Sequence, residues 1–463
     1  LVTGASAFNF DLSKPGQVWD DSSARADYRH RASGQPFFAV FNYTMTHESQ
    51  VRRRPHTWQH DVERAPVPPY HPNTLEVRQD WAQYYDNITV FDAKVGEHLR
   101  RLEEEGLADD TIVMVYGDHG PGLPRCKRWP YDSGLRVGLV IFIPEKFRAL
   151  APSDYRPGGE ISRLVAFVDL APTVLSLSGI QPPEWMQGRA FLGPYAAEPA
   201  EFLFGLRGRM DERIDMVRSV RNARYVYLRH YLPHRIYGQH IDYMFKNPTT
   251  RIWKEWYELG RLDSPAQRRF WEPKPCEELY DLQADPHETI NLADSPEHKA
   301  VLKTMRQALR DHVLTIRDTG FLPEAEVHRR AAKAGVTIGE FARRTDLYPL
   351  ERIFEAAELA AQRDEAAVSR LITMLEDQDS GVRYWAAVGL CIRNGPAVAA
   401  GRDALRRALS DESPSVRIAA AEALARFGSA EDRPSAVAVL TGLMSPQEAG
   451  AYTAIAALNA LDA

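Results

Sequence analysis

Thr111-Ile112-Val113-Met114-Val115-Tyr116-Gly117-Asp118-His119-Gly120 is an apolar run of strand type that ends in a polar turn. A second apolar run, residues 137–143, follows beyond a loop that holds Lys127. Asp118 offers a hard carboxylate ligand and His119 a ring nitrogen. In open α/β sheets, ligands bind beyond the carboxyl ends of the strands. We therefore expect Asp118, His119 and Lys127 to form part of a site for a metal ion and an anion.

Strands and helices alternate through the first part of the chain. Residues 37–41 form an apolar run of strand type. A long helix is predicted from about Thr74 to Glu105, because apolar positions recur along it and Gly106 can end it. Residues 166–179 predict another helix, with a proline in its first turn. This alternation favours an α/β layered fold with a largely parallel sheet.

The middle of the chain has a different pattern. Residues 216–220 and 225–228 alternate in polarity like paired strands, and residues 278–281 form another short strand. A last helix is predicted near residues 296–317. These elements predict a small α+β subdomain after the layered part.

The C-terminal part repeats itself. From about Asp364 the chain is rich in alanine and leucine, and residues 375–387 match residues 409–421 at an offset of 34. A weaker third unit ends near residues 451–454. The pattern resembles HEAT-type helical repeats, which stack on a shared core and usually offer a binding face. Plain helical hairpins packed on the rest of the chain are the alternative.

Composition limits the class of protein. The 463 residues suffice for roughly two or three domains, and a net charge of -6 gives no general basic field for nucleic acid. No apolar run approaches the ~20 residues that span a bilayer. Cys126, Cys276 and Cys391 are too few and too widely spaced for a disulfide framework or a zinc motif.

Several motifs occur in an order that resembles a known family. They are residues 37–47, the pattern that runs from Pro69 to Tyr85, the turn 117–120, and the strand 278–281 with Asp285-Pro286-His287-Glu288 and Asn291-Leu292 after it. Together they resemble the sulfatases of the alkaline-phosphatase superfamily over about residues 8–325. The likeness is greatest to the heparan N-sulfatase (sulfamidase) branch. The resemblance implies an alkaline-phosphatase-like layered sheet followed by a small α+β subdomain.

The resemblance also implies a mechanism. In this family a formylglycine, made from a cysteine or serine, attacks sulfur while a calcium ion binds the sulfate oxygens. Asp118 and His119 match two ligands of that calcium. Lys127 matches the cation that holds the sulfate, and His47 matches the histidine that hydrogen-bonds the sulfate and protonates the leaving atom.

Two family elements have no match in the sequence. The Cys/Ser-x-Pro-x-Arg segment that supplies the nucleophile is absent, and so is the N-terminal Asp-Asp pair. The adjacent pair Asp20-Asp21 is interpreted as part of a loop. We therefore expect an N-terminally truncated sulfatase whose formylglycine and remaining calcium ligands lie upstream of Leu1. This fragment alone is expected to be inactive.

Two further groups of residues are open to more than one interpretation. Asp285-Pro286-His287-Glu288 has the composition of a metal cluster, whereas the family resemblance implies a structural turn. His230, His234 and His240 lie in an aromatic and basic stretch. They either line a glycan pocket or simply pack in the interior.

The functional hypothesis is a sulfatase that hydrolyses sulfate esters or sulfamates of a sulfated carbohydrate. A phosphatase or phosphonate hydrolase of the same superfamily is one alternative, and a non-catalytic binding protein on a degenerate sulfatase scaffold is another. The family implies a periplasmic or secreted location. A protein partner would bind the HEAT-like tail, and neither nucleic acid nor a membrane span is expected.

The predicted domains follow from these patterns. They are the C-terminal part of a sulfatase catalytic domain (1–200), a sulfatase C-terminal subdomain (201–325), a linker (326–363) and HEAT-like helical repeats (364–463).

Overall fold

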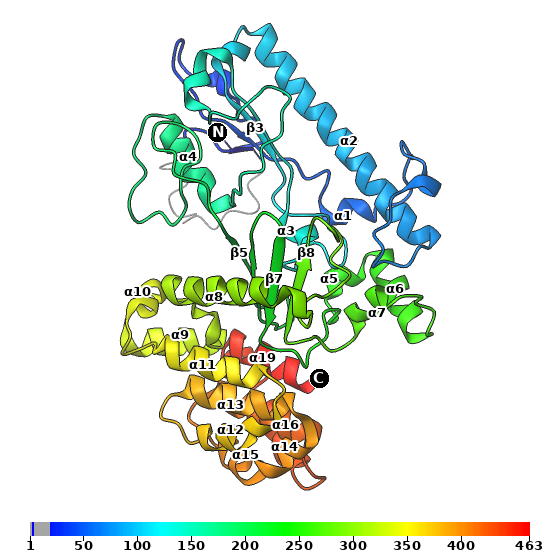
Figure 1. Cartoon of the computed structure of the whole chain (residues 1–463), viewed down its shortest axis with the longest axis vertical. Helices are drawn as coiled ribbons and strands as arrows, with labels where there is room; N and C mark the ends of the chain where they lie inside the picture. The colour runs from blue at the N-terminus through cyan, green and yellow to red at the C-terminus, as the bar shows by residue number, and fades with distance from the viewer. Residues whose placement is uncertain (1, 4–18) are drawn as a thin grey trace. The chain divides into compact units, whose positions relative to one another are not determined.

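The structure is a computed structural model that describes residues 2–3 and 19–463. The chain divides into two compact units (Figure 1). Unit 1 comprises Leu1–Val67 and Asn73–Thr111, and unit 2 comprises Pro68–Pro72 and Ile112–Ala463. The region predicted as catalytic domain, residues 1–200, therefore contributes to both units.

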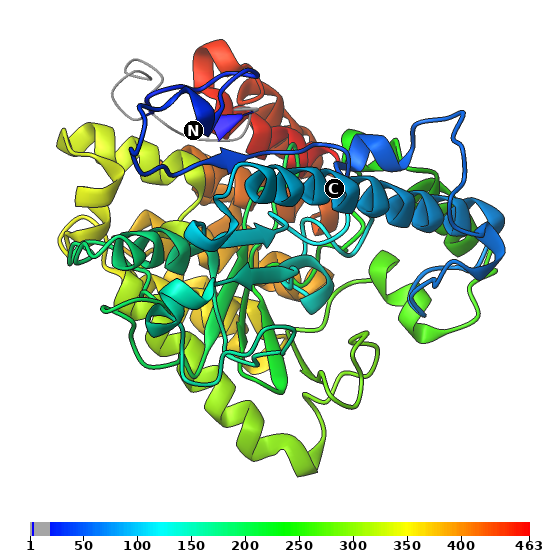
Figure 2. The same cartoon turned by 90° about the horizontal axis from the view of Figure 1, so that it is seen from above.

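Unit 1 is built around one long helix. This helix, α2 (Leu75–Glu104), begins where the Thr74 hydroxyl accepts a hydrogen bond from the main-chain N–H of Val77. It ends before Gly106, whose φ of 67° is the left-handed conformation that glycine adopts at helix ends. The predicted helix is thus confirmed. Strand β2 (Val40–Phe41) runs along it (Figure 2), and the Phe41 ring lies 4.3 Å from the ring of His98.

The remaining elements of unit 1 are short. Strand β1 (Val2–Thr3) pairs in parallel with β2. The described residues of this unit also form the one-turn helices η2 (Tyr28–His30), α1 (Glu48–Val51), η3 (Val62–Arg64) and η4 (Ala108–Asp110).

Unit 2 opens with a pair of strands, β3 (Val113–Tyr116) and β4 (Leu139–Phe142), which are antiparallel. The connection between them, residues 117–138, holds one short helix, α3 (Asp132–Leu135). Among the described strands only β1 and β2 are parallel, so the predicted largely parallel sheet is wrong for this part of the chain. The pair is followed by η5 (Glu145–Leu150), η6 (Phe167–Asp169) and α4 (Leu170–Leu177).

A four-stranded antiparallel sheet forms the centre of unit 2. Its order is β5 (Leu203–Arg207), β6 (Val217–Arg221), β7 (Tyr225–His230) and β8 (Glu277–Asp281). Helix α8 (Lys299–Ile316) packs across β6 and β7 (Figure 1). The predicted small α+β subdomain is confirmed. Between and after the strands lie α5 (Asp242–Phe245), α6 (Pro248–Glu258), α7 (Pro265–Arg268), η7 (Arg269–Trp271) and η8 (Pro296–His298).

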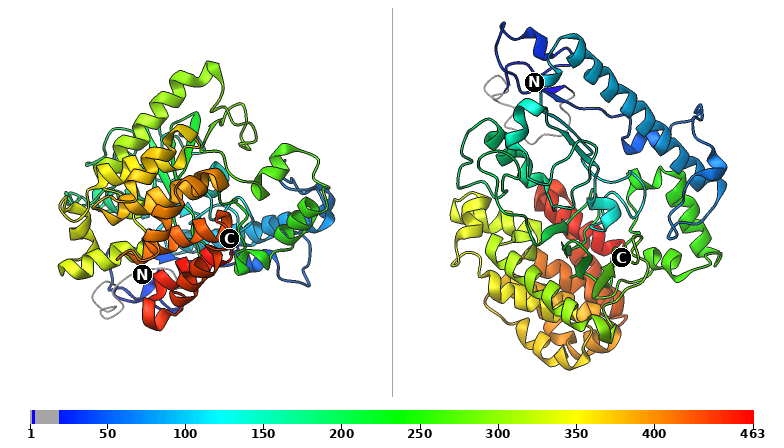
Figure 3. Two further views of the ribbon diagram at one scale, coloured as in Figure 1. Left: turned by 90° about the horizontal axis from the view of Figure 1, so that it is seen from below. Right: turned by 45° about the horizontal axis from the view of Figure 1, so that its top comes forward.

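The rest of unit 2 is helical. The two matching sequence repeats correspond to the helix pairs α12–α13 and α15–α16, and α11, α13 and α16 stack side by side (Figure 3). The helices are η9 (Thr319–Phe321), α9 (Glu324–Ala334), α10 (Ile338–Arg343), α11 (Leu350–Ala361), η10 (Glu365–Ala367), α12 (Val368–Met374), α13 (Ser380–Ile392), α14 (Asn394–Ala400), α15 (Arg402–Ala408), α16 (Pro414–Phe427), α17 (Arg433–Gly442), α18 (Pro446–Ala449) and α19 (Ala451–Leu461).

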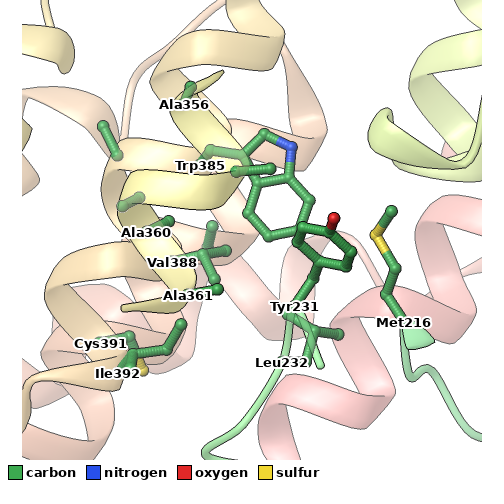
Figure 4. Close-up of a cluster of buried hydrophobic side chains, with 14 of the residues drawn as sticks. Met216, Tyr231, Leu232, Ala356, Ala360, Ala361, Trp385, Val388, Cys391 and Ile392 are labelled. Carbon is green, nitrogen blue, oxygen red and sulfur yellow. The ribbon is translucent and has the colours of Figure 1, made fainter. Parts of the chain in front are cut away.

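Residues 326–363, expected to be a linker, are packed structure. They include most of α9 and all of α10 and α11, and the apolar side chains of Ile353 and Phe354 on α11 are buried. One apolar core joins this helical region to the sheet. In that core the Trp385 indole of α13 lies beside the ring of Tyr231, which follows β7 (Figure 4), with ring centroids 6.2 Å apart.

Trp385 also donates its indole N–H to the carbonyl of Phe321 at 2.7 Å. A buried indole with a satisfied N–H fixes both position and orientation of a helix. The inner face of the repeats is therefore already occupied by the chain's own sheet subdomain. Within the described residues, no helix combines the length and the apolar character needed to cross a bilayer.

Candidate functional site

Asp118 and His119 lie in the turn after β3, as the sequence predicted. The Asp118 side chain is 85% exposed, and its Oδ1 lies 3.7 Å from Nε2 of His119. His119 Nδ1 lies 2.6 Å from the carbonyl oxygen of Gly120. Since a carbonyl can only accept, Nδ1 carries the proton and Nε2 is left with its lone pair toward Asp118. The Asp118 carboxylate and Nε2 of His119 therefore lie close together as two potential metal ligands.

Two glycines allow this turn to pass close to its neighbours. A Cβ added at Gly120 would lie 1.9 Å from the carbonyl oxygen of Ser133, and a Cβ at Gly134 would lie 2.2 Å from that of Trp129. The main-chain N–H of Gly120 donates to the carbonyl of Gly134 at 3.0 Å. The strand end that carries Asp118 is thus held against α3 by backbone contacts that no larger residue permits.

Lys127 lies in the same loop. Its main-chain N–H donates to the carbonyl of Pro121 at 3.0 Å, and its side chain is partly exposed. The preceding Arg125 is buried, with a φ of 66°, and its guanidinium lies over the rings of Tyr70 at 4.2 Å and Tyr131 at 4.0 Å. These rings hold Arg125 inside the protein. Because the buried Arg125 lies only two residues before Lys127, it holds the main chain at Lys127 in place.

The turn Asp285-Pro286-His287-Glu288 holds this loop in place through hydrogen bonds to Arg125 and Asp132. Asp285 Oδ2 accepts from the main-chain N–H of Thr289 at 2.6 Å, which closes the turn. The buried Glu288 carboxylate accepts from the main-chain N–H of Asp132, and the Glu288 carbonyl accepts from the Arg125 guanidinium at 2.7 Å. Burial raises the pKa of Glu288 to about 8, against the opposing effect of Arg125. These contacts favour the structural interpretation of the motif over a metal cluster.

Asp118, His119 and Lys127 all lie in the connection between β3 and β4 of unit 2. Sequence reasoning missed Arg125 and Glu288 as residues that shape it. A non-glycine residue with positive φ leaves no clear mark in a sequence. Their contact also spans 163 positions, beyond the reach of local patterns.

His47 lies in unit 1, where it caps helix α1. Its Nδ1 accepts from the main-chain N–H of Ser49 at 3.3 Å and lies 3.0 Å from the Ser49 hydroxyl. An Nδ1 that accepts a hydrogen bond places the ring proton on Nε2. The neutral His47 ring is therefore a hydrogen-bond donor through Nε2, which is the chemistry required to bind an anion.

The pair Asp20-Asp21 belongs to a loop. Asp21 accepts from the Ser23 hydroxyl at 3.2 Å and lies 3.7 Å from the partly exposed ring of His30. These are local contacts of a surface turn, in agreement with the sequence interpretation.

The cysteines do not have the character of nucleophiles. Cys126 and Cys391 are buried, and burial raises their thiol pKa values to about 11 and about 12 respectively. A thiol reacts through its thiolate, which such values suppress near neutral pH. The Cys276 thiol donates to the carbonyl of Ala361 at 3.0 Å.

The histidines of the 225–243 stretch pack in the interior or against neighbouring rings. His230 Nε2 lies 3.2 Å from a carboxylate oxygen of Glu278, and the ring of His240 lies 4.2 Å from the ring of Phe245. His234 is buried beside Glu422. The positions of His230 and His234 favour packing over a glycan-binding role, whereas His240 is exposed.

Among the described residues, one group of three ligand side chains lies close enough to share a metal ion: His234, Cys391 and Glu422, with ligand atoms within 4.8 Å of one another. The group does not fit a cation. Glu422 already accepts from Arg235 at 2.8 Å and from Arg426 at 3.3 Å. Although burial acts to raise it, these charges and His234 lower the pKa of Glu422 to about 2. Two guanidinium groups at the carboxylate would repel a metal ion.

The chemistry of the Asp118–His119 pair fits part of a calcium site. Asp118 supplies a carboxylate that no lysine or arginine among the described residues neutralises, and His119 directs Nε2 to the same region. Calcium takes six to eight ligands, most of them oxygen. This pair therefore supplies at most a small part of a complete coordination shell.

Comparison with known proteins gives two family matches. Residues 16–180 match the sulfatase family model, and residues 398–461 match the model for HEAT repeats. All four candidate residues, His47, Asp118, His119 and Lys127, lie inside the first segment.

Individual relatives agree with the first match. The chain is 36% identical over 355 residues to an ulvan-active sulfatase of Formosa agariphila, which covers 69% of this chain and 58% of the relative. It is 28% identical over 262 residues to the N-sulphoglucosamine sulphohydrolase of Homo sapiens, with 52% of this chain and 49% of the relative covered. The chain thus spans about half the length of the curated relatives it matches.

Solved structures give weaker matches. A phosphonate monoester hydrolase of Agrobacterium radiobacter matches at 21% identity and a TM-score of 0.36, over 51% of this chain and 42% of that one. A 2-O glycosaminoglycan sulfatase matches at 18% identity and a TM-score of 0.36, over 55% and 50%. Neither TM-score defines the fold of the whole chain. The sequence matches identify residues 16–180 as a sulfatase-family segment, similar to curated sulfatases, and place HEAT repeats in the C-terminal part of the chain.

Proposed function

We propose that this chain is part of a sulfatase that hydrolyses sulfate esters or sulfamates of a sulfated glycan by a formylglycine and calcium mechanism. One observation carries the proposal: the sulfatase-family segment, residues 16–180, contains every candidate site residue. The relatives named for ulvan and for N-sulphoglucosamine suggest the substrate class, a sulfated polysaccharide or its fragments. The nucleophile is part of the proposal and lies outside the 463 residues.

In this proposal each residue has a defined role. Asp118 and His119 hold calcium, which when bound supplies a Lewis acid for the sulfate oxygens. Lys127 donates to a sulfate oxygen and offsets the negative charge that the sulfuryl group carries in transfer. The fixed backbone around Lys127 limits the freedom of its ammonium group, which favours one binding geometry.

His47 is proposed to act through Nε2. The hydrogen bond from Ser49 to Nδ1 sets the tautomer in which Nε2 carries the proton. That proton can bind a sulfate oxygen or pass to the leaving oxygen or nitrogen atom.

The helical region is proposed to stabilise the sulfatase part. Its inner helices share one core with the sheet, through side chains such as Trp385 and Tyr231. A protein partner, if the tail binds one, would contact the outer helices α12 and α15. For the protein as a whole we propose a periplasmic or secreted location, as is usual for enzymes that degrade extracellular glycans.

The test uses the complete natural protein that contains these residues. Release of sulfate from ulvan oligosaccharides and from N-sulfoglucosamine is measured for the wild type, for Lys127→Ala and for Lys333→Ala. Lys333 is exposed on α9, away from the candidate loop. Lys127→Ala should lower kcat by about 100-fold, the usual effect of losing one charged group from a transition-state site. Lys333→Ala should retain full activity.

The 463-residue chain alone provides the complementary test. It should show no measurable sulfate release, because it holds neither the nucleophile segment nor the Asp-Asp pair. Robust hydrolysis by the chain alone, or full activity of Lys127→Ala in the complete protein, contradicts the proposed mechanism.

A further inference from the structure

A large pocket lies in unit 2 among the sheet, α8 and α11. Its volume is about 640 Å³, within the range of small-molecule sites. Strands β7 and β8 supply one wall, α8 supplies the second, and α11 with the residues after it supplies the third. None of its lining residues belongs to the loop that holds Asp118 and Lys127. The pocket exists only because the helical region packs against the sheet.

The pocket is cationic, although the chain as a whole carries a net charge of -6. Five of its lining side chains are lysine or arginine and three are aspartate or glutamate. Two of the carboxylates are already engaged. Glu277 pairs with Arg306 and accepts from the Tyr227 hydroxyl at 2.9 Å. Glu358 accepts from Arg229 at 2.7 Å and from the Tyr231 hydroxyl at 2.7 Å.

The remaining cations are weakly compensated. Lys303 forms no ion pair with any described residue, and it is exposed. Arg310 lies 3.9 Å or more from the exposed carboxylates of Glu351 and Glu355, too far for a hydrogen bond. Among the described residues, Arg363 donates to the carbonyls of Pro233 and Lys274, at 3.2 and 3.1 Å, and to no carboxylate. The third carboxylate, Asp364, accepts from the main-chain N–H of Ala366 at 2.9 Å and offsets one of these charges, so Lys303, Arg310 and Arg363 still leave the pocket positive.

Their arrangement suits an extended anion better than a single ion. Lys303 and Arg310 stand two turns apart on one face of α8, about 10 Å along its axis. Arg363 approaches from the opposite wall, after α11. A lone sulfate or phosphate ion cannot reach all three cations. A chain of sugar residues with several anionic groups can, and Gln307 and Gln362 on the walls match its hydroxyl groups.

We propose that this pocket binds an acidic saccharide segment, bearing sulfate or carboxylate groups, at a subsite separate from the candidate catalytic loop. The choice of a saccharide over another polyanion rests on the proposed function, because a sulfated glycan is the polyanion that a sulfatase meets. The positive charge and the size of the pocket do not depend on it. The pocket would hold one part of a long glycan while another part is processed.

The experiment measures binding of a heparin-derived tetrasaccharide to the 463-residue chain by isothermal titration calorimetry. Lys303→Gln/Arg310→Gln should weaken binding by at least about tenfold, the effect of losing two charged contacts. Lys333→Gln/Arg370→Gln is the matched control, since it removes the same charge from exposed positions outside the pocket. Melting temperatures of both variants verify that they fold. A neutral tetrasaccharide of N-acetylglucosamine should not bind.

A third variant separates this proposal from the proposed function. Asp118→Asn/Lys127→Ala removes the candidate catalytic loop's charges and should leave tetrasaccharide binding at the pocket intact. Binding that disappears in this variant, or that falls equally in the pocket and control variants, overturns the inference. Absence of wild-type binding overturns it as well, as does equal affinity for inorganic sulfate. Failure of the complete protein to release sulfate would leave these binding results unaffected.

Discussion

The main-chain N–H of Asp132 donates to both carboxylate oxygens of Glu288, at 3.0 and 3.1 Å. Asp132 opens α3, directly after the loop that carries Lys127, and Glu288 belongs to a turn 156 positions away. Arg125, at the other side of the loop, donates to the Glu288 carbonyl. One glutamate thus joins both ends of the loop. The family-specific turn acts on the candidate site through the backbone rather than by binding metal or substrate.

Glu288→Gln should change the pH dependence of stability. Burial raises the folded pKa from its ordinary 4.5 to about 8. Between these values the folded chain keeps a proton that the unfolded chain has lost, so stability falls as pH rises, by at most about 1.4 kcal/mol per pH unit. Glutamine does not titrate and removes this slope. Urea unfolding at pH 5, 6.5 and 8 measures it, with exposed Glu297→Gln as control. Parallel curves for wild type and Glu288→Gln would contradict the prediction.

Gly120→Ala should destabilise the chain and disturb the Asp118 turn. Its new methyl group would overlap the Ser133 carbonyl oxygen, which is backbone and cannot rotate away. We expect a loss of about 1–3 kcal/mol, the usual cost of overpacking. Gly138→Ala is the matched control, because its Cβ would meet nothing within 4 Å. Thermal unfolding of both variants checks the difference, and equal melting temperatures would show that the close approach does not exist.

Local signals predicted the local elements. The Thr74 cap and Gly106 define α2, and the 34-residue offset located the helix pairs α12–α13 and α15–α16. Asp118, His119 and Lys127 could be grouped because they lie within ten positions of one another, in a single connection between two strands. Their roles in the reaction stay predictions.

Contacts between distant segments could not be read from the sequence. The pairing of β3 with β4 depends on the path of the connecting loop, which no periodicity encodes. Residues 326–363 were interpreted as a linker because they precede the repeat, yet α11 buries Ile353 and Phe354 in the core that the sheet and the helical region share. The pocket beside α8 arises from the same docking, which sequence patterns do not describe.

Glu326→Gln should weaken the helical region. This buried carboxylate of α9 accepts from the Ser380 hydroxyl at 2.5 Å and from the Ser413 hydroxyl at 2.9 Å, so it joins both repeats. Although burial acts to raise it, hydrogen bonds from Arg329, Ser380 and Arg330 lower its pKa to about 2. Breaking such a buried charged network costs roughly 3 kcal/mol. Urea unfolding at pH 7 measures the loss.

The stabilisation that the Glu326 carboxylate contributes should depend on pH. Since its folded pKa lies below the ordinary value of 4.5, its stabilisation is complete above pH 4.5 and is lost as pH falls toward about 2. The difference between wild type and Glu326→Gln should therefore shrink on acidification. Glu448→Gln, at an exposed position of α18, should match the wild type throughout. A difference that stays constant down to pH 3 would rule out the charged network.

Arg383 and Arg417 occupy equivalent positions of the two repeats and should respond differently to replacement by lysine. Arg383 donates to both carboxylate oxygens of Asp411, at 2.7 and 2.9 Å, whereas Nε of Arg417 has no hydrogen-bond partner among the described residues. Lysine cannot form the two-pronged contact. Arg383→Lys should therefore cost about 2 kcal/mol, and Arg417→Lys less than about 0.5 kcal/mol. Urea midpoints of the two variants test this directly. Equal losses would mean that the arginine–aspartate contact between repeats does not stabilise the tail.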